Sequence, residues 1–449
     1  MSKNLYIKTF GCQMNERDSE IIEQLLAQEG YVPTDSAADA DVILINTCSI
    51  REKAEQKVFS LLGHLRQEKK RNPRLLLGVT GCVAQQEGEQ IKERMPHVDL
   101  IVGTQQIYYL PEMLERLTYK TTVREIATNL DASFEIPPFQ KLLKTTPPSP
   151  APQSYKRFVT IMQGCNNFCS YCVVPGTRGR EISRPVSDII EEVEILVSQG
   201  VKEITLLGQN VNSYGQTNAV AEAPVTFPDL LRRVAAVGGL KRLRFTTSNP
   251  KDLTDDLMRC FAELDILCPH FHLPVQSGSN AVLKMMNRKY TVEQYLEKVD
   301  GLRRYCPDIA LATDIIVGFP GESEADFEAT MGLLNQVRFH ASFSFKYSDR
   351  PHTRSAEFID KIPEVIKKQR LMTFQNRQDE LSLERNFESL GATVEVMIED
   401  CGETSVKGRT GANQVVHMPH SSMPLAPGDL VMVRIDHAGK HSLNGTIAP

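Results

Sequence analysis

The first third of the chain alternates short apolar runs with amphipathic segments. Strands are predicted at 5–10, 41–46, 74–80 and 99–102, and helices near 18–28, 51–66, 84–94 and 110–118. The predicted strands are almost wholly apolar rather than alternating, as expected for parallel strands that are covered on both faces. Residues 1–120 are therefore predicted to form a doubly wound α/β domain with a parallel sheet.

A second alternation of strand and helix patterns runs from residue 157 to 382. Its strands are predicted at 158–162, 203–207, 243–247, 270–275, 309–317 and 342–347. Six such units predict a parallel sheet in the form of a partial or full β/α barrel.

The remaining segments differ in composition. Residues 141–156 contain four prolines and predict an extended linker. From 385 to 449, short strand patterns broken by glycines occur at 392–398, 405–409, 414–417, 430–435 and 442–447, and they predict a small all-β barrel.

Composition limits the function classes. The 449 residues are 41% hydrophobic and 24% charged, which is typical of a globular protein and excludes a disordered or collagen-like chain. No apolar run approaches the roughly 18 residues of a membrane helix, and the chain begins without an apolar signal core. We expect a soluble cytoplasmic protein that has no membrane partner.

The net charge of −5 means that a nucleic acid would have to be held by local basic patches. One candidate is the stretch 141–180, with six Lys or Arg residues and no Asp or Glu: Lys141, Lys144, Lys156, Arg157, Arg178 and Arg180. A second comprises Arg66, Lys69, Lys70, Arg71 and Arg74, with a single Glu68 between them. These charges could attract phosphates, although a run of this kind is equally typical of a solvated helix face.

Three of the ten cysteines follow predicted strands of the first domain. Cys12, Cys48 and Cys82 each come one or two residues after a strand. Because the carboxyl ends of parallel strands lie along one edge of a sheet, these thiols can converge where such folds bind ligands. The neighbouring Gly11 and Gly81 suit tight turns or a close approach of the backbone to a ligand.

Three further cysteines, Cys165, Cys169 and Cys172, lie within eight residues directly after the first barrel strand. A cubic iron–sulfur cluster normally takes four thiolates, so three leave one iron open to a molecule other than protein. A structural zinc site would need a fourth ligand at short spacing, and the nearest histidines, His270 and His272, are roughly a hundred residues away. The four other cysteines are expected to pack as small apolar side chains.

The C-x3-C-x2-C spacing at the first loop of a β/α barrel resembles the radical S-adenosylmethionine (SAM) superfamily. The resemblance implies a 4Fe-4S cluster whose open iron binds SAM, and one-electron cleavage of SAM to methionine and a 5′-deoxyadenosyl radical. It also implies cofactor contacts from the aromatic residue before the last cysteine and from strand-end motifs: Tyr171, Gly208, Gln209, Asn210, Ser248, Val317 and Gly318. The alternative for each is a simple turn that ends a strand.

When Cys12, Cys48 and Cys82, the first triad, are considered as well, the chain as a whole resembles the methylthiotransferases. The matching loops are 9–15, 46–52 and 80–82, and the resemblance implies a second 4Fe-4S cluster with an open iron on Cys12, Cys48 and Cys82. One cluster would make the radical and the other would carry sulfur, with SAM also donating the methyl group.

The stretches 48–54 and 173–181 are most similar to the branch that modifies N6-isopentenyladenosine beside the tRNA anticodon. The family usually has an aromatic residue where Gly176 stands, a departure that leaves the cysteines untouched.

By this resemblance the partners are the anticodon stem-loop of tRNA, SAM, and an electron donor and a sulfur donor of unknown identity, and the chain is expected to be a monomer. The C-terminal barrel resembles the RNA-binding TRAM domain, with Lys407, Arg409 and Arg434 as candidate contacts. No residue is singled out as a general acid or base.

Two alternatives stay open. The same chemistry could act on threonylcarbamoyladenosine in tRNA or on an aspartate of a ribosomal protein. From another class, the chain could be a non-catalytic iron–sulfur module that binds or senses RNA.

Overall fold

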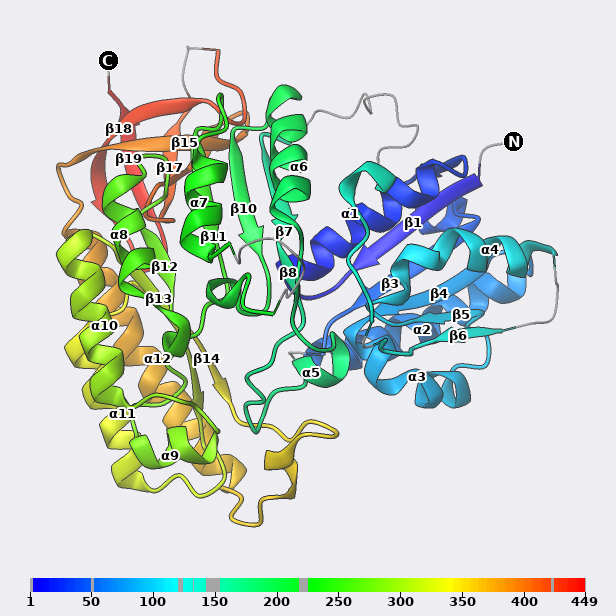
Figure 1. Ribbon diagram of the computed structural model, residues 1–449, viewed down its shortest axis with the longest axis horizontal. Coiled ribbons are helices and arrows are strands. Elements are labelled where there is room, and N and C mark those ends of the chain that lie inside the picture. The colour runs from blue at the N-terminus through cyan, green and yellow to red at the C-terminus, as the bar shows by residue number, and fades with distance from the viewer. Residues whose placement is uncertain are drawn as a thin grey trace.

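A computed structural model describes residues 3–49, 52–119, 124–131, 133–142, 154–217, 225–420 and 424–448, with only the backbone for 52–55. Residues 143–153, most of the predicted linker, lie outside the described residues, as do Ile50 and Arg51 of the second cysteine loop. Figure 1 shows an α/β domain at the amino end, a central barrel, and a small β-barrel at the carboxyl end.

The first domain is a six-stranded parallel sheet in the order β2-β1-β3-β4-β5-β6. Its strands are β1 (Lys3–Thr9), β2 (Tyr31–Pro33), β3 (Val42–Thr47), β4 (Leu76–Gly81), β5 (Leu100–Val102) and β6 (Glu125–Ala127). Its helices are α1 (Gln13–Ala27), α2 (Glu52–Arg71), α3 (Cys82–Arg94) and α4 (Leu110–Tyr119), with short 3-10 turns at Ala37–Asp39, Gln106–Tyr109 and Phe139–Leu142.

Alternate residues of β3 serve two separate cores. Val42 and Leu44 pack on one face with residues of α1 and α4, whereas Ile43 and Ile45 pack on the other with residues of α2 and α3. The predicted doubly wound domain is confirmed. The pattern missed the outer strands β2 and β6, which have three residues each.

Helix α1 begins five residues before the predicted start. Its first turns contain Asn15, Arg17 and Asp18, whose polar side chains are typical of a loop or a solvated surface. All three are buried, at 0%, 3% and 5% exposure, because α1 packs on the central barrel.

The central domain contains six parallel strands: β7 (Lys156–Thr160), β10 (Glu203–Leu207), β11 (Arg242–Phe245), β12 (His270–His272), β13 (Ala310–Val317) and β14 (Ala341–Lys346). They form two three-stranded sheets, β11-β10-β7 and β12-β13-β14, which are joined by a parallel bridge between Leu243 and Leu267. The barrel is therefore partial, with β7 and β14 at its two edges among the described strands.

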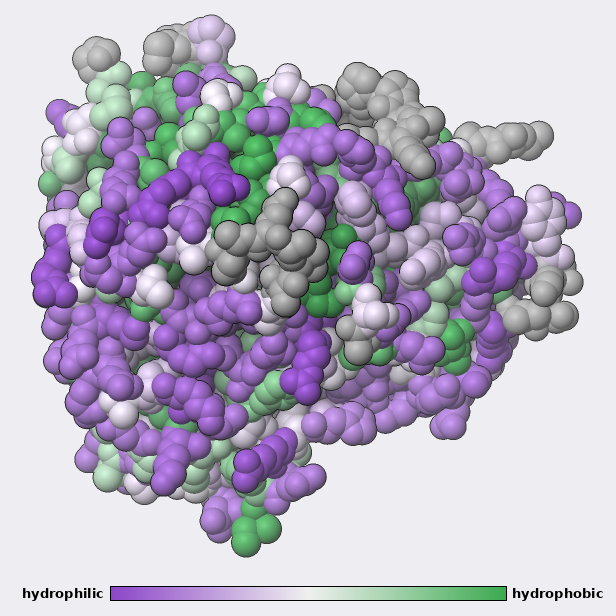
Figure 2. All heavy atoms as spheres, viewed as in Figure 1, coloured by the Kyte–Doolittle hydropathy of each residue, from purple (hydrophilic) through white to green (hydrophobic). Residues whose placement is uncertain are grey.

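The helices that cover this sheet are α6 (Val186–Ser198), α7 (Phe227–Ala235), α8 (Asp255–Glu263), α9 (Asn280–Met285), α10 (Val292–Tyr305), α11 (Glu324–Val337) and α12 (Glu364–Phe387). A short α5 (Val174–Thr177) and the two-residue strands β8 (Met162–Gln163) and β9 (Ile182–Ser183) follow the first barrel strand. Further 3-10 turns occur at Val211–Ser213, Pro250–Asp252 and Arg354–Glu357. Hydrophilic residues dominate the outer side of α10 and α11 (Figure 2), whereas Tyr295, Val299 and Leu302 of α10 are buried.

The carboxyl end is a closed five-stranded barrel in the order β15-β16-β17-β19-β18, as predicted. Its strands are β15 (Thr393–Cys401), β16 (Ser405–Thr410), β17 (Val415–Pro419), β18 (Leu430–Ala438) and β19 (Leu443–Ile447). Two arginines of β11 fix it to the central domain: Arg242 donates to the Arg409 carbonyl at 2.7 Å and Arg244 to the Gly411 carbonyl at 2.9 Å.

Across the described parts of the chain, none of the helices combines the length and the apolar character needed to span a bilayer.

Candidate functional site

The first three cysteines lie at the carboxyl edge of the parallel sheet. Cys12 precedes the first residue of α1, Cys48 follows β3, and Cys82 is the first residue of α3. The register pairs Thr9 with Asn46 and Thr47 with Gly81, so the three strands end side by side. The thiols, far apart in sequence, converge where the sequence predicted.

Two glycines allow this convergence. A Cβ on Gly11 would lie 2.1 Å from the Cβ of Cys48, and one on Gly81 would lie 2.4 Å from the Thr47 carbonyl oxygen. Both glycines have a positive φ, +120° and +89°, a backbone conformation that residues with a side chain rarely adopt. The backbone at Gly11 therefore crosses directly over Cys48.

The protonation of these thiols depends on their neighbours. A hydrogen bond from Cys48 and the nearby Arg178 charge lower the pKa of Cys12 to about 6, against the effect of burial. Burial raises the pKa of Cys82, and the Arg178 charge opposes that rise. The site thus combines soft sulfur donors with a buried positive charge, which suits an anionic iron–sulfur cluster.

The second triad, Cys165, Cys169 and Cys172, is called the barrel triad and lies on one loop directly after β8. Gly164, with φ +81°, turns the chain into this loop, and its missing Cβ would lie 2.0 Å from the Arg180 carbonyl oxygen. Burial raises the pKa of Cys172 to about 12 and also raises that of Cys165. Ligation by these thiols would release protons, as metal binding to thiols generally does.

Arg288, which the sequence reading did not single out, donates to the Cys169 sulfur at 3.3 Å. Its two other nitrogens donate to the Tyr290 hydroxyl at 2.9 Å and the Pro274 carbonyl at 3.1 Å. No local motif marks this arginine, because it lies 119 positions from Cys169.

Three of the expected SAM contacts keep buried polar atoms that hydrogen-bond to nothing in the described structure. They are Gln209 Nε2, Asn210 Oδ1 and Ser248 Oγ. The other amide atoms are used: Gln209 Oε1 accepts from the backbone of Gly164, and Asn210 Nδ2 donates to Asp252 at 2.8 Å. Buried polar atoms without partners are rare and costly, so a cluster of them is typical of a ligand site.

The other expected contacts are more varied in their positions. Tyr171 packs against an apolar cluster that includes Phe319 and Met286. Gly208 lies where a Cβ would be 2.4 Å from Met162 Cγ, and Gly318 has φ +69° beside Lys367. Val317 belongs to the main core of the central domain, whereas Ile316 packs against the same small apolar cluster as Tyr171. Their contacts with SAM stay predictions.

Glu181 was missed as a site residue, although it lies in a stretch that carried the family resemblance. Its Oε2 accepts from Ser213 at 2.8 Å, while its buried Oε1 lacks a partner within the described residues. Burial raises the pKa of Glu181 to about 7. Thr160, at the end of β7, also keeps an unpartnered buried hydroxyl among these residues.

The segment 173–184 connects the two triads. It leaves the barrel loop at Cys172 and passes along the first domain, where Thr104 donates to the Thr177 carbonyl at 2.6 Å. Figure 1 shows α5 between the barrel and α3 of the first domain. The sequence offered Arg178 as a phosphate contact. That prediction is wrong, because Arg178 is 3% exposed and pairs with Asp18 at 2.6 Å.

The rest of that basic stretch is also partly engaged. Lys156 pairs with Glu399 at 3.2 Å, whereas Arg180 stacks over the ring of Phe168, which is 42% exposed on the cysteine loop. In the terminal barrel, Glu399 also binds Arg409 at 3.0 Å.

Within the described residues, no three His, Cys, Asp or Glu side chains lie close enough to bind one metal ion. The fit of iron–sulfur clusters therefore depends on the donor chemistry: two sets of three cysteine thiols that form no disulfide, each set beside a guanidinium, with unpartnered polar atoms among the described residues next to the barrel set.

Two family models match the chain. Residues 4–103 match the model described as uncharacterized protein family UPF0004, and residues 159–334 match the radical SAM superfamily.

Full-length relatives are close in sequence. The chain is 59% identical to the tRNA-2-methylthio-N(6)-dimethylallyladenosine synthase of Desulfotalea psychrophila, over 99% of both chains. It is 49% identical to the protein of the same name from Syntrophobacter fumaroxidans, over 99% of this chain and 95% of the relative.

Solved structures share the fold at low identity. The radical SAM methyltransferase TsrM from Kitasatospora setae has a TM-score of 0.56 at 14% identity, covering 79% of this chain and 74% of TsrM. The cobalamin-dependent radical SAM enzyme OxsB has a TM-score of 0.51 at 12% identity, covering 84% of this chain and 56% of OxsB.

Proposed function

We propose that the two triads have different roles, on the premise that the chain belongs to the family of tRNA-2-methylthio-N(6)-dimethylallyladenosine synthases. It is a radical SAM methylthiotransferase that modifies N6-dimethylallyladenosine in tRNA. We assign radical formation to Cys165, Cys169 and Cys172, and sulfur delivery to Cys12, Cys48 and Cys82.

The observation that carries this assignment is the convergence of Cys12, Cys48 and Cys82 at one sheet edge, linked by segment 173–184 to the barrel triad. Each triad supplies three thiols, one fewer than a four-iron cluster takes, so a cluster on either would keep an iron open. When bound, the barrel cluster supplies the electron that cleaves SAM.

The residues around the barrel triad would hold and orient SAM. Gln209, Asn210, Ser248 and Glu181 provide unpartnered polar atoms for its amino, carboxylate and hydroxyl groups. Glu181 is suited to the SAM ammonium, because a carboxylate gives a charge-assisted hydrogen bond to a cation. Tyr171 provides an apolar wall beside the cysteines.

Two surfaces are suited to the RNA. Phe168 of the cysteine loop and Arg180 of segment 173–184 form an exposed aromatic and cationic pair, which suits stacking with an unpaired base. Unstacking a loop base costs only a few kcal/mol.

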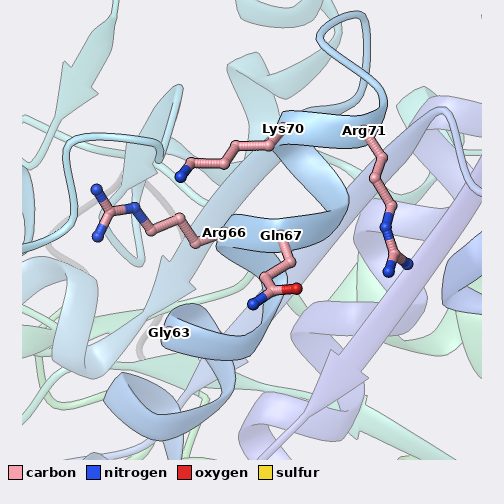
Figure 3. A pocket seen from close by; sticks show the side chains of 5 residues that line it. All are labelled: Gly63, Arg66, Gln67, Lys70 and Arg71. Carbon is pink, nitrogen blue, oxygen red and sulfur yellow. The ribbon is translucent and has the colours of Figure 1, made fainter.

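The second RNA surface is on α2. Arg66, Lys70 and Arg71 line a surface hollow of about 610 Å³, and Figure 3 shows Arg66 and Lys70 extending to the same side of the helix. Lys69 is not available there, because it pairs with Asp99 at 2.7 Å. Arg66 is fourteen residues from the start of α2, about 21 Å along its axis, so this surface would reach the RNA stem rather than the modified base.

The proposal needs a one-electron donor and a sulfur donor from outside the chain. It does not need a second copy of the chain, because both triads and the terminal barrel are in one polypeptide. We therefore propose a monomer.

The test is the iron and sulfide content of anaerobically reconstituted protein. Two four-iron clusters predict about eight irons per chain, and removing either triad should leave about four. A value near four in the unaltered protein, unchanged by replacing Cys12, Cys48 and Cys82, would exclude the second cluster.

A further inference from the structure

One arginine crosses from the barrel domain to the first triad. Arg178 caps α5, and its backbone N–H donates to the Val174 carbonyl at 2.8 Å. The chain on both sides of it is fixed: Thr104 donates to the Thr177 carbonyl, and a Cβ on Gly179 would lie 2.9 Å from Gln105 Nε2. The guanidinium therefore has little freedom to move relative to the first domain.

Its side chain ends beside the first turn of α1. Nη2 donates to Asp18 at 2.6 Å and to Asn15 Oδ1 at 3.0 Å. Asn15 is fixed in turn, because its backbone N–H donates to the Cys12 carbonyl and its amide to the Phe10 carbonyl. The arginine is thus attached to the turn that carries Cys12.

The other terminal nitrogen, Nη1, is buried and has no acceptor anywhere in the described part of the chain. A buried charged donor that is left unused costs more than an ordinary hydrogen bond contributes. The neighbouring groups are sulfurs: Asn15 Oδ1, which accepts from Arg178, also accepts from Cys12 Sγ at 3.8 Å, and the Cys82 thiol lies close enough to the guanidinium to interact with it.

Arg288 at the barrel triad provides the contrast. All three of its nitrogens have acceptors, one of them the Cys169 sulfur, and it belongs to the same domain as that cysteine. Arg178 comes from the other domain and keeps one donor free.

We infer that Arg178 is a positioning residue for sulfur chemistry at the first triad: its free Nη1 donates to a sulfur of the cluster held by Cys12, Cys48 and Cys82. Its charge stabilises the more negative, reduced state of that cluster and so raises the midpoint potential. Asp18, on the far side of the guanidinium, has the opposite electrostatic effect. This inference rests on the proposed second cluster.

The experiment uses full-length protein with Cys165, Cys169 and Cys172 replaced by Ala, so that the first cluster is observed alone. Its midpoint potential is measured by redox titration followed by electron paramagnetic resonance. Arg178→Met should lower the potential by at least 59 mV, a tenfold change in a one-electron equilibrium constant. Asp18→Asn should raise it, and Arg178→Lys should lower it by less than Arg178→Met.

The matched control is Arg17→Met. Arg17 is equally buried at the same domain boundary, where it pairs with Glu192 at 2.6 Å, so its loss damages the interface without removing the charge beside the cysteines. Its potential should match that of the parent. Equal shifts for Arg17→Met and Arg178→Met, or shifts of the same sign for Arg178→Met and Asp18→Asn, would assign Arg178 a merely structural role.

The possible failures are distinguishable. If the parent with the barrel cysteines replaced binds no iron, the second cluster itself is wrong and the inference fails with it. If the cluster is present and Arg178→Lys and Arg178→Met both leave the potential unchanged, only the role of Arg178 is overturned. If Arg178→Met does not fold, Arg178→Lys and Asp18→Asn still give shifts of opposite sign or contradict the inference.

Discussion

The two triads reach similar donor sets by different routes. The barrel thiols lie on one eight-residue loop, so local sequence brings them together, whereas the first three thiols need three strands in register and two glycines. Their electrostatics differ at one thiol: the first triad contains Cys12, whose pKa is lowered to about 6, whereas burial raises the pKa of Cys82 in that triad and of Cys165 and Cys172 in the barrel triad. A ligand set built by tertiary structure depends on distant packing, and one built by a loop does not.

The largest expected effect comes from removing each triad. Replacing Cys165, Cys169 and Cys172 with Ala should abolish formation of 5′-deoxyadenosine, measured by chromatography, because the radical cluster is lost. Replacing Cys12, Cys48 and Cys82 should preserve SAM cleavage but eliminate the 2-methylthio nucleoside, measured by mass spectrometry of tRNA. Equal loss of SAM cleavage in both variants would mean that the triads do not have separate roles.

One added methyl group should disrupt the first triad and leave the barrel triad intact. Gly11→Ala places a Cβ 2.1 Å from that of Cys48 at φ +120°, which should destabilise the first domain by about 3 kcal/mol, the upper end of common substitutions. About half of the iron should be lost while the barrel cluster remains. Gly176→Ala is the control, because nothing lies within 4 Å of its added Cβ. Unchanged iron content in Gly11→Ala would contradict the dependence on close packing.

Changing a residue that we propose holds SAM should have a smaller effect, limited to the binding of SAM at the barrel triad. Glu181→Gln should weaken SAM binding roughly tenfold, about 1.4 kcal/mol, the scale of one charge-assisted hydrogen bond. Equilibrium binding of SAM to reconstituted protein measures it. Ser198→Ala, at an exposed helix end, should bind SAM like the unaltered protein. Identical affinity in Glu181→Gln would remove Glu181 from the pocket.

The smallest expected effect is on RNA affinity. The double variant Arg66→Glu, Lys70→Glu should weaken tRNA binding several-fold, because two phosphate contacts are lost. The slope of the logarithm of the binding constant against the logarithm of the salt concentration should fall in magnitude by about 1.4 to 1.8. Fluorescence anisotropy at several salt concentrations measures both. Lys92→Glu, an exposed change on α3, serves as the control. If the slope does not change, α2 presents only a solvated face.

Much of the fold was predictable because burial on both faces leaves a near-continuous apolar pattern in parallel strands, as in β3. The edge strands β2 and β6 were missed because they are short and partly exposed, whereas the equally short β5 is fully buried and shows an apolar run. The start of α1 was missed because Asn15, Arg17 and Asp18 are polar but buried against another domain.

The sequence by itself determined the donor chemistry: the spacing of Cys165, Cys169 and Cys172, and the position of three other cysteines directly after apolar strands. Only the tertiary structure decided which charges serve those sulfurs. The sequence predicted that Arg178 is a surface cation, but in the structure it is buried beside Cys12. Arg288 lies 119 positions from the cysteine that it contacts. The physical reason is that a cysteine spacing is local, whereas the partner of a buried charge is chosen by packing between segments far apart in the chain.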